Sequence, residues 1–322
     1  MPLDSIRSLV QADLDAADRF ICSELRSDIP FINDLVDHII KCGGKRIRPL
    51  IVLLTARAFN HQKQQHIELA VAIELVHTAT LLHDDVVDNS TMRRGQETAN
   101  KIWGNEASVL VGDFLYSRAF ELIVKLQNLE IINFFAKATN IIAEGEVMQL
   151  LNCHDPEISE AAYFEVIQRK TAKLFEIASQ ASTALTNYTP SQLTAMQHYG
   201  NHLGIAYQLI DDALDYSASL EQLGKNIGND LAEGKPTLPL IYALRQSKTS
   251  EAALLREAIK TGSTQKLSEI LEIIESTGAI KYTASAAKYH AKQASLALSA
   301  IPHSPYCQAL NELTNFVVER AY

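Results

Sequence analysis

Two copies of the pattern Asp-Asp-x-x-Asp, each at the end of an apolar, helix-like run, constrain this chain of 322 residues more than any other feature. Residues four apart on a helix share a face and lie about 6 Å apart, so Asp84 and Asp88 can hold one divalent ion between them. A lone copy could equally be a solvated acidic turn, but two copies in one chain are improbable by chance. The aspartates of the two copies are Asp84, Asp85, Asp88, Asp211, Asp212 and Asp215.

The chemistry of these side chains predicts the class of ligand. Carboxylates and water suit hard ions such as Mg²⁺, which keeps several waters and binds through one or two carboxylates plus the phosphates of a ligand. Two acidic clusters that face each other across a cavity repel unless cations lie between them, and those cations attract a polyanion such as diphosphate. We therefore expect a site for a phosphorylated ligand. A calcium module is disfavoured, because the glycine and terminal glutamate of an EF-hand loop are missing.

The composition excludes other classes of protein. The formal net charge of −9 argues against a nucleic-acid partner, and the hydrophobic share of 47% suffices for a full core. No linker rich in Pro, Gly or Ser divides the sequence, so we predict a single domain over residues 1–322. The sequence shows no apolar run of membrane-spanning length, no signal or transit peptide and no CxxC pair among its four cysteines. We expect a soluble, cytoplasmic protein.

Helical periodicity extends over most of the sequence. No segment shows the alternating pattern of a strand bounded by turn signals, so the predicted fold class is all-α. The last third, from about residue 251, reads as amphipathic helices without identifiable chemistry. The other predicted helical segments are 4–26, 31–41, 51–59, 67–88, 107–125, 131–151, 159–185 and 192–216.

Basic residues gather beside the first acidic motif. Lys45 and Arg48 lie in a short loop between Gly44 and the next helix, where the free N–H groups and the helix dipole favour an anion. An ordinary basic loop remains the alternative. His77 precedes Asp84 by two helical turns and so shares its face. A loop after the motif brings Arg93 and Arg94 close to the aspartates.

Three further segments have less certain roles. Lys170 and Thr171 fall within a helix, where they are either amphipathic surface or inward-pointing phosphate donors. The segment 144–151 is acidic and apolar, and it either supports the site residues from behind or merely flanks the core; we favour the second interpretation. The glycines at 224, 228 and 234 mark a mobile loop whose lysines, Lys225 and Lys235, can reach back over a phosphate site as a lid.

Taken together, these residues resemble the trans-isoprenyl diphosphate synthases, the family that makes farnesyl, geranylgeranyl and longer polyprenyl diphosphates. That family folds as a single antiparallel all-α bundle around a central cavity and is usually a homodimer. The resemblance runs in order through six segments: GGKRIRP at 43–49, LLHDDVVDNSTMRRG at 81–95, GDFLYSRAF at 112–120, KTAKLF at 170–175, YQLIDDALD at 207–215 and GKNIGNDLAEGKPTLPLI at 224–241.

The resemblance implies a role for each candidate residue. The six aspartates would bind Mg²⁺, three ions per site, bridging the diphosphate of an allylic substrate. Arg93, Lys170, Lys225 and Lys235 would contact the same diphosphate. Thr171 and Gln208 would lie beside the reacting carbon. The site for isopentenyl diphosphate would comprise Lys45, Arg48, His77 and Arg94.

The mechanism expected from the resemblance is electrostatic. The cations stabilise negative charge on the diphosphate as the allylic C–O bond breaks, the double bond of isopentenyl diphosphate attacks the allylic cation, and a proton is lost to the departing diphosphate. No protein nucleophile is needed, and water must be excluded.

Product length depends on the helix before the first motif. In short-chain members of the family a bulky aromatic floors the pocket there, whereas this chain has Ala79 and Thr80. We therefore expect a long product of about eight isoprene units, typical of ubiquinone side chains, with a stop deeper in the pocket that the sequence does not reveal. The alternatives are a shorter-chain synthase, a silent subunit of a heteromeric synthase, and a class I terpene cyclase. The cyclases lack the GGKR loop and the second DDxxD that this chain keeps.

Overall fold

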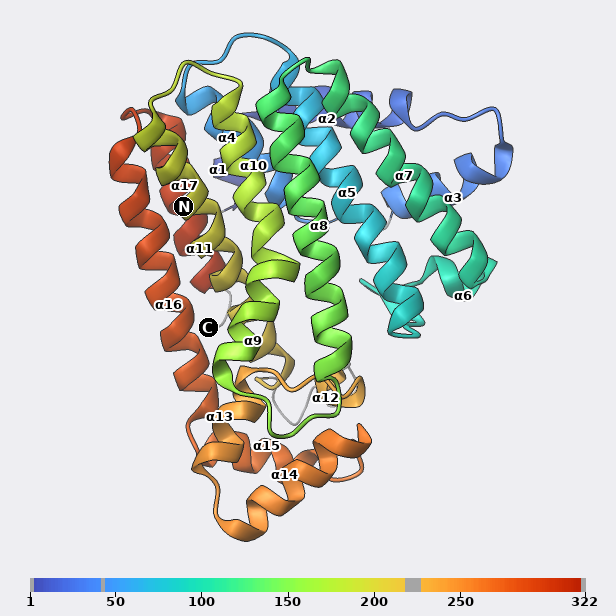
Figure 1. Cartoon of the computed structure of the whole chain (residues 1–322), viewed down its shortest axis with the longest axis vertical. Coiled ribbons are helices and arrows are strands. Elements are labelled where there is room, and N and C mark those ends of the chain that lie inside the picture. Colours follow the sequence, from blue (N-terminus) through green and yellow to red (C-terminus); the bar gives the residue numbers. More distant parts are fainter. Residues whose placement is uncertain (1–2, 42–43, 218–226, 320–322) are drawn as a thin grey trace.

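The chain is all-α, as the periodicity predicts (Figure 1). The computed structural model is 79% helical and describes residues 3–41, 44–217 and 227–319. Within these ranges, no helix is both long and apolar enough to cross a membrane. The helices are α1 (Leu3–Ser8), α2 (Gln11–Glu24), α3 (Pro30–Lys41), α4 (Ile47–Ala58), α5 (Gln65–Val87), α6 (Ala99–Trp103), α7 (Asn105–Lys125), α8 (Leu129–Asn152), α9 (Glu160–Ile167), α10 (Lys173–Ala184), α11 (Pro190–Asp215), α12 (Asn229–Ala232), α13 (Leu238–Gln246), α14 (Thr249–Thr261), α15 (Leu267–Ser276), α16 (Ala279–Ala297) and α17 (Pro305–Glu319).

Two predicted helices are interrupted. The segment 4–26 divides into α1 and α2, because a turn at residues 9–10 changes the direction of the chain. The segment 159–185 contains one π-helical turn, Gln168–Ala172 (η1), between α9 and α10. A π turn inserts an extra residue and rotates the side chains that follow, and such turns are frequent at functional sites. The η1 turn carries Lys170 and Thr171.

The loop after α5 forms a small hairpin. Its strands β1 (Met92–Arg93) and β2 (Gln96–Glu97) pair antiparallel. Arg94 and Gly95, at the turn, both have positive φ, of 52° and 79°. This conformation suits glycine, and in a two-residue hairpin loop it matches the twist of the strands. The hairpin fixes the position of both arginines relative to the end of α5.

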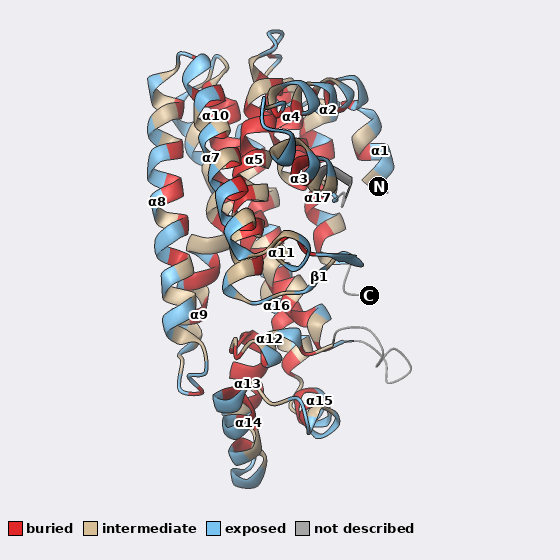
Figure 2. Cartoon of the chain, turned by 90° about the vertical axis from the view of Figure 1, so that its right-hand side faces the viewer, coloured by how far each residue is buried: buried red, intermediate tan, exposed pale blue. Residues whose placement is uncertain are grey.

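The long helices run side by side, with α13, α14 and α15 gathered at the lower end in Figure 1. The largest cluster of buried apolar residues draws on α4, α5, α7, α8, α10 and α11. A second cluster lies among α12 to α16, and a third joins α9, α11 and α13 (Figure 2). Both acidic motifs lie at the C-terminal ends of their helices, α5 and α11.

Close approach of helices brings the site residues together. Gly145 of α8 packs against η1 so tightly that a Cβ there would lie 2.7 Å from the backbone N of Lys170. A side chain at this position would force the two helices apart. Gly145 therefore keeps α8 next to the turn that carries Lys170.

Candidate active site

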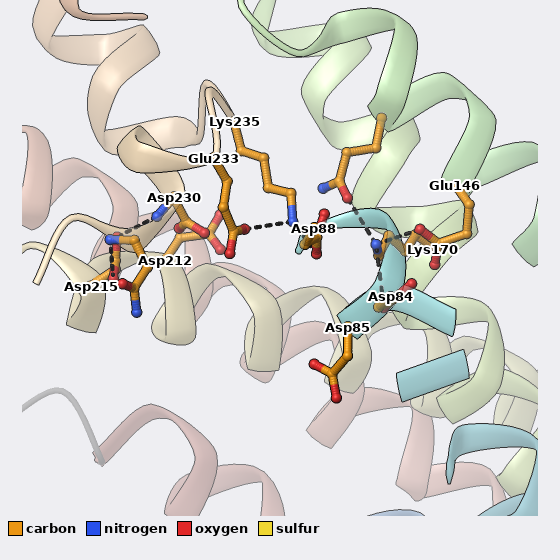
Figure 3. Close-up of polar contacts among 12 residues, drawn as sticks. Asp84, Asp85, Asp88, Glu146, Lys170, Asp212, Asp215, Asp230, Glu233 and Lys235 are labelled. Carbon is orange, nitrogen blue, oxygen red and sulfur yellow. Dashed lines mark hydrogen bonds and ion pairs between the residues drawn. The ribbon is translucent and has the colours of Figure 1, made fainter. Parts of the chain in front are cut away.

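The first acidic motif divides between two environments. Asp84 and Asp88 face the cavity: the Asp84 carboxylate lies 3.5 Å from Lys170 Nζ, and Asp88 accepts a 2.7 Å hydrogen bond from Lys235 Nζ (Figure 3). Asp85 points away from them, is buried, and accepts hydrogen bonds of 2.9 and 2.7 Å from Arg93. The i, i+4 spacing thus places one carboxylate pair on a common face, while Asp85 positions Arg93.

The three aspartates of the second motif differ from one another. Asp212 accepts hydrogen bonds from Gln208 and Tyr163. Asp215 accepts the backbone N–H groups of residues 229 and 230, at 3.2 and 3.1 Å, and so caps the start of α12. Burial lowers the pKa of Arg48, and the negative charge of Asp211 opposes this lowering. Asp211 is therefore near enough to Arg48 for the two charges to interact.

The two lysines bridge the acidic walls of the cavity. Lys170 donates hydrogen bonds to Glu146 and, at 2.8 Å, to Gln149, both on α8. Lys235 donates to Glu233 as well as to Asp88. Lys170 therefore points inward, which the sequence alone leaves open. The interpretation of 144–151 as a segment that merely flanks the core is wrong, because Glu146 and Gln149 line the cavity.

The pKa shifts reveal an excess of negative charge. Burial, with a contribution from Asp84, raises the pKa of Glu146 to about 7. Burial also raises the pKa of Asp212 to about 7, and that of Asp230 well above its usual value, with Asp212 adding to the second shift. Clustered carboxylates with raised pKa values are stabilised by added positive charge. The site therefore favours bound cations.

The donor set fits Mg²⁺ held jointly by protein and ligand. Asp84, Asp88, Asp212, Asp230 and Glu233 line a polar cavity of about 240 Å³. Within the described ranges, no three acidic, histidine or cysteine side chains converge closely enough to cage a metal ion on their own. This arrangement suits an ion that takes one or two carboxylates and fills its other positions with water and phosphate oxygens.

A second basic group lies across α5. Arg48 Nη1 is 3.0 Å from His77 Nε2, and the guanidinium lies 4.4 Å from the centre of the Phe175 ring. Burial and the nearby Arg48 lower the pKa of His77 well below its usual value, so the neutral imidazole accepts this hydrogen bond. The Arg94 guanidinium packs directly on Gly44, where a Cβ would clash with it. Arg48, His77 and Arg94 therefore converge. Lys45 is exposed on the loop before α4.

Arg93 links the two regions. It lines the 240 Å³ cavity and also a smaller cavity of about 90 Å³ that contains Arg46, His77 and Arg94. An acidic cavity that two lysines cross and a smaller, basic cavity thus lie on either side of Arg93.

A third cavity, of about 440 Å³, leads away from Asp84, Asp88 and the two lysines between α5, α7 and α8. Its deeper walls are largely apolar and include Thr80, Tyr116, Ile142 and Ala143. Ala79 is fully buried in the core and is not among the residues that line it. The combination of a polar mouth and an apolar interior suits an amphiphilic ligand.

Several lining residues were not identified from the sequence. Asp230 and Glu233 lie in the GNDLAEGKP segment. Their negative charge between two glycines is a signal by which the sequence could have identified them as site residues. The sequence pattern assigns Glu146 and Gln149 to a helix that flanks the core. Tyr163 gives no signal, because a buried tyrosine in an apolar helical repeat looks like an ordinary core residue. The predicted diphosphate contact at Lys225, and the turn at Gly224, lie outside the described residues.

Comparison with known proteins identifies relatives along the whole chain. The model of the family described as "Polyprenyl synthetase" matches residues 29–276. An octaprenyl diphosphate synthase of Haemophilus influenzae is 49% identical over 100% of this chain and 98% of its own, and that of Escherichia coli K12 is 47% identical over 99% of each.

Solved structures agree with this assignment. A polyprenyl synthase from Caulobacter crescentus CB15, in complex with calcium and isoprenyl diphosphate, superposes with a TM-score of 0.94 at 43% identity, covering 99% of this chain and 98% of that one. A decaprenyl diphosphate synthase from Rhodobacter capsulatus gives a TM-score of 0.95 at 37% identity over the full length of both chains. The all-α bundle with its two aspartate motifs therefore belongs to the polyprenyl synthetase family.

Proposed function

We propose that this protein is a Mg²⁺-dependent prenyltransferase that extends an allylic diphosphate, farnesyl diphosphate, through successive trans condensations with isopentenyl diphosphate. The observation that carries the proposal is the junction at Asp84 and Asp88, where the acidic cavity crossed by Lys170 and Lys235 meets an apolar cavity, while the basic cavity adjoins the acidic one at Arg93. The relatives at 47–49% identity are octaprenyl diphosphate synthases, so we assign a product of about eight isoprene units. Such a chain is suited to the side chain of a quinone such as ubiquinone.

The proposed roles follow from the positions of the side chains. Lys170, Lys235 and Arg93 hold the allylic diphosphate, and Mg²⁺ held by carboxylates of both motifs would supply the positive charge that the departing diphosphate requires. Arg48, His77, Arg94 and Lys45 hold isopentenyl diphosphate on the other side of Arg93. Its double bond then forms the new C–C bond with the allylic carbon, and the proton released passes to the departing diphosphate. The cavity walls keep water from the cation.

We propose three Mg²⁺ ions per site, held between Asp84 and Asp88 on α5 and the aspartates of α11. The related Caulobacter structure, with calcium and isoprenyl diphosphate, supports binding of a divalent ion together with a diphosphate in this fold. The unusually acidic walls support more than one ion, since a single divalent cation would leave much of their charge uncompensated.

Tyr116 is the proposed stop at the deep end of the cavity. Its half-buried ring lies on α7 opposite Thr139 of α8, and both residues line the cavity. Tyr116→Ala removes the ring and lengthens the space available to the chain, so we expect longer products than in the wild type. Chromatography of the dephosphorylated products measures the shift. A Tyr116→Phe variant keeps the ring and should retain the wild-type length, and an unchanged distribution in Tyr116→Ala would place the stop elsewhere.

We propose a homodimer formed through α7 and α8. Apolar side chains are exposed along both helices: Leu110 is 68% exposed, Leu150 61% and Leu151 76%. The outer face of α8 is seen at the left of Figure 2. A second copy placed there would cover these residues and close the side of the 440 Å³ cavity.

We also propose that residues 1–322 act as one domain, since α11 and α16 run from the large core to the lower helices. We further propose that the protein works in the cytoplasm.

The dimer proposal makes a direct prediction. Leu110→Asp combined with Leu151→Asp places charges in the proposed interface, so we expect light scattering to report a monomer where the wild type reports a dimer. Ile29→Asp, at an apolar residue that is 56% exposed but far from α7 in sequence and outside both helices, is the matched control. A wild type that is monomeric at micromolar concentration would contradict the proposal.

Product analysis tests the function itself. The purified protein is incubated with Mg²⁺, farnesyl diphosphate and labelled isopentenyl diphosphate, and the products are separated by length. A ladder that ends near eight units supports the proposal. A ladder that ends near four units, one condensation beyond the three units of farnesyl diphosphate, indicates a shorter-chain synthase. No incorporation by folded protein indicates a silent subunit that requires an active partner.

A further inference from the structure

We propose that Tyr163 of α9 is a positioning residue, which holds Asp212 and through it the side chains of Gln208 and Thr171 at the allylic carbon. This inference rests on the proposed function and assigns a role to a residue outside the recognised motifs. Tyr163 is 4% exposed and Asp212 is 2% exposed, so the bond between them is shielded from water.

A continuous chain of hydrogen bonds connects the four side chains. The Tyr163 hydroxyl donates to Asp212 Oδ2. Gln208 Nε2 donates to Asp212 Oδ1 at 2.7 Å, and Thr171 Oγ1 donates to Gln208 Oε1 at 2.9 Å. All four residues line the same 240 Å³ cavity. Three separate elements, α9, η1 and α11, are thus joined at the reacting end of the site.

The direction of these bonds follows from the chemistry of Asp212. Both Asp212 oxygens accept hydrogen bonds, so Gln208 turns its NH₂ group toward the carboxyl group and its carbonyl oxygen toward Thr171. The Thr171 hydroxyl then donates its hydrogen bond to Gln208, and its oxygen lone pairs remain free to face the cavity. Oxygen lone pairs stabilise positive charge on a nearby carbon. The chain therefore orients Thr171 to favour the allylic cation.

The Tyr163 hydroxyl keeps the Asp212 carboxyl group in the orientation that accepts the hydrogen bond from Gln208. Each Asp212 oxygen has one hydrogen-bond donor, Tyr163 on Oδ2 and Gln208 on Oδ1. Without the phenol, the carboxylate is free to rotate away from Gln208 toward the cations of the cavity. The Gln208 amide then loses the constraint that fixes its orientation, and Thr171 loses its acceptor.

The test uses a variant that removes one oxygen atom. Tyr163→Phe keeps the buried ring, and we expect kcat to fall about tenfold, the order expected for a hydrogen bond to a charged group, while the KM values for both diphosphates change less than about twofold. Tyr282→Phe is the matched control, because that phenol also donates to a carboxylate on α9, Glu160, at 2.6 Å, but does not line the cavity. Its kcat should equal that of the wild type.

A double-mutant cycle separates positioning from general stability. In a Gln208→Leu background the chain is already broken, so Tyr163→Phe should lower kcat no further. Calorimetric titration of the Tyr163→Phe protein with Mg²⁺ and inorganic diphosphate should give an affinity no weaker than that of the wild type. Additive losses in kcat, weakened diphosphate binding, or a kcat equal to that of the wild type would each overturn the proposal.

Asp212→Asn provides a second approach to the same bond. The carboxamide has one acceptor oxygen, and if Tyr163 takes it, the NH₂ group faces the NH₂ of Gln208 and forces that amide to flip. We expect a larger loss in kcat than for Tyr163→Phe, because Asp212→Asn also removes one of the proposed Mg²⁺ contacts of α11, and a wild-type kcat would count against the inference. Failure of the proposed function is distinguishable from these outcomes, because it appears as no product from the wild-type protein.

Discussion

Asp84→Ala is expected to lower kcat by about 10³-fold, the upper range for removal of one group that stabilises charge in a transition state. Asp84 faces the cavity next to Asp88, and Lys170 lies 3.5 Å from it. Removal of the carboxylate eliminates one of the two proposed metal contacts on α5, so negative charge on the leaving diphosphate is poorly compensated. Steady-state kinetics over a range of Mg²⁺ concentrations measure the loss, and higher Mg²⁺ should restore only part of it.

The fold should survive this substitution. Asp84 lies among carboxylates and contributes to the raised pKa of Glu146, so its removal relieves repulsion. Lys170 keeps its hydrogen bonds to Glu146 and Gln149. We expect a melting temperature without Mg²⁺ that is equal to or above that of the wild type. Asp155→Ala, at an exposed carboxylate outside the cavities, is the control for charge alone. A near-normal kcat for Asp84→Ala would refute the proposed role of the first motif.

Thr80→Tyr is expected to shorten the product to about four isoprene units, one more than the three of farnesyl diphosphate. Thr80 lines the 440 Å³ cavity one helical turn before Asp84, so a ring at this position blocks the path of the growing chain. The rate of the first condensations should change little, because the diphosphate contacts lie at the other end of the cavity. Product length is measured after incubation with farnesyl diphosphate and labelled isopentenyl diphosphate. Thr80→Ser, which keeps a small side chain, should retain the wild-type length.

Ala79→Tyr tests the neighbouring position. We expect mainly a cost in stability of about 1–3 kcal/mol and a smaller effect on product length than for Thr80→Tyr, because Ala79 is fully buried and outside the cavity lining, so a ring there overpacks the core. Thermal melting separates the two variants. If neither variant changes the product, the length is set entirely beyond this turn of α5, and Tyr116 becomes the remaining candidate.

Local patterns in the sequence were sufficient for the helices and for the outline of the site. Apolar periodicity identified the all-α class, since a 3.6-residue repeat reports on one buried face whatever its partner is. The i, i+4 spacing placed Asp84 and Asp88 on one face, and the glycines beside Lys45 and Lys235 marked the basic loops. These are properties of ten or twenty consecutive residues, so sequence alone carries them.

Only the tertiary structure decided which side chains meet. Asp85 and Asp215 belong to the motifs, yet Asp85 holds Arg93 and Asp215 caps α12, because their direction depends on neighbouring elements. The π turn points Lys170 toward α8 and Thr171 toward α11, and it cannot be recognised from the hydrophobic periodicity of the sequence. Tyr163 and Glu146 reach the cavity from α9 and α8, outside both motifs, and Gly145 permits the close approach of α8 to the turn that carries Lys170. Sequence therefore determined the helices and the charges of this protein, whereas packing between helices determined the partner of each charge.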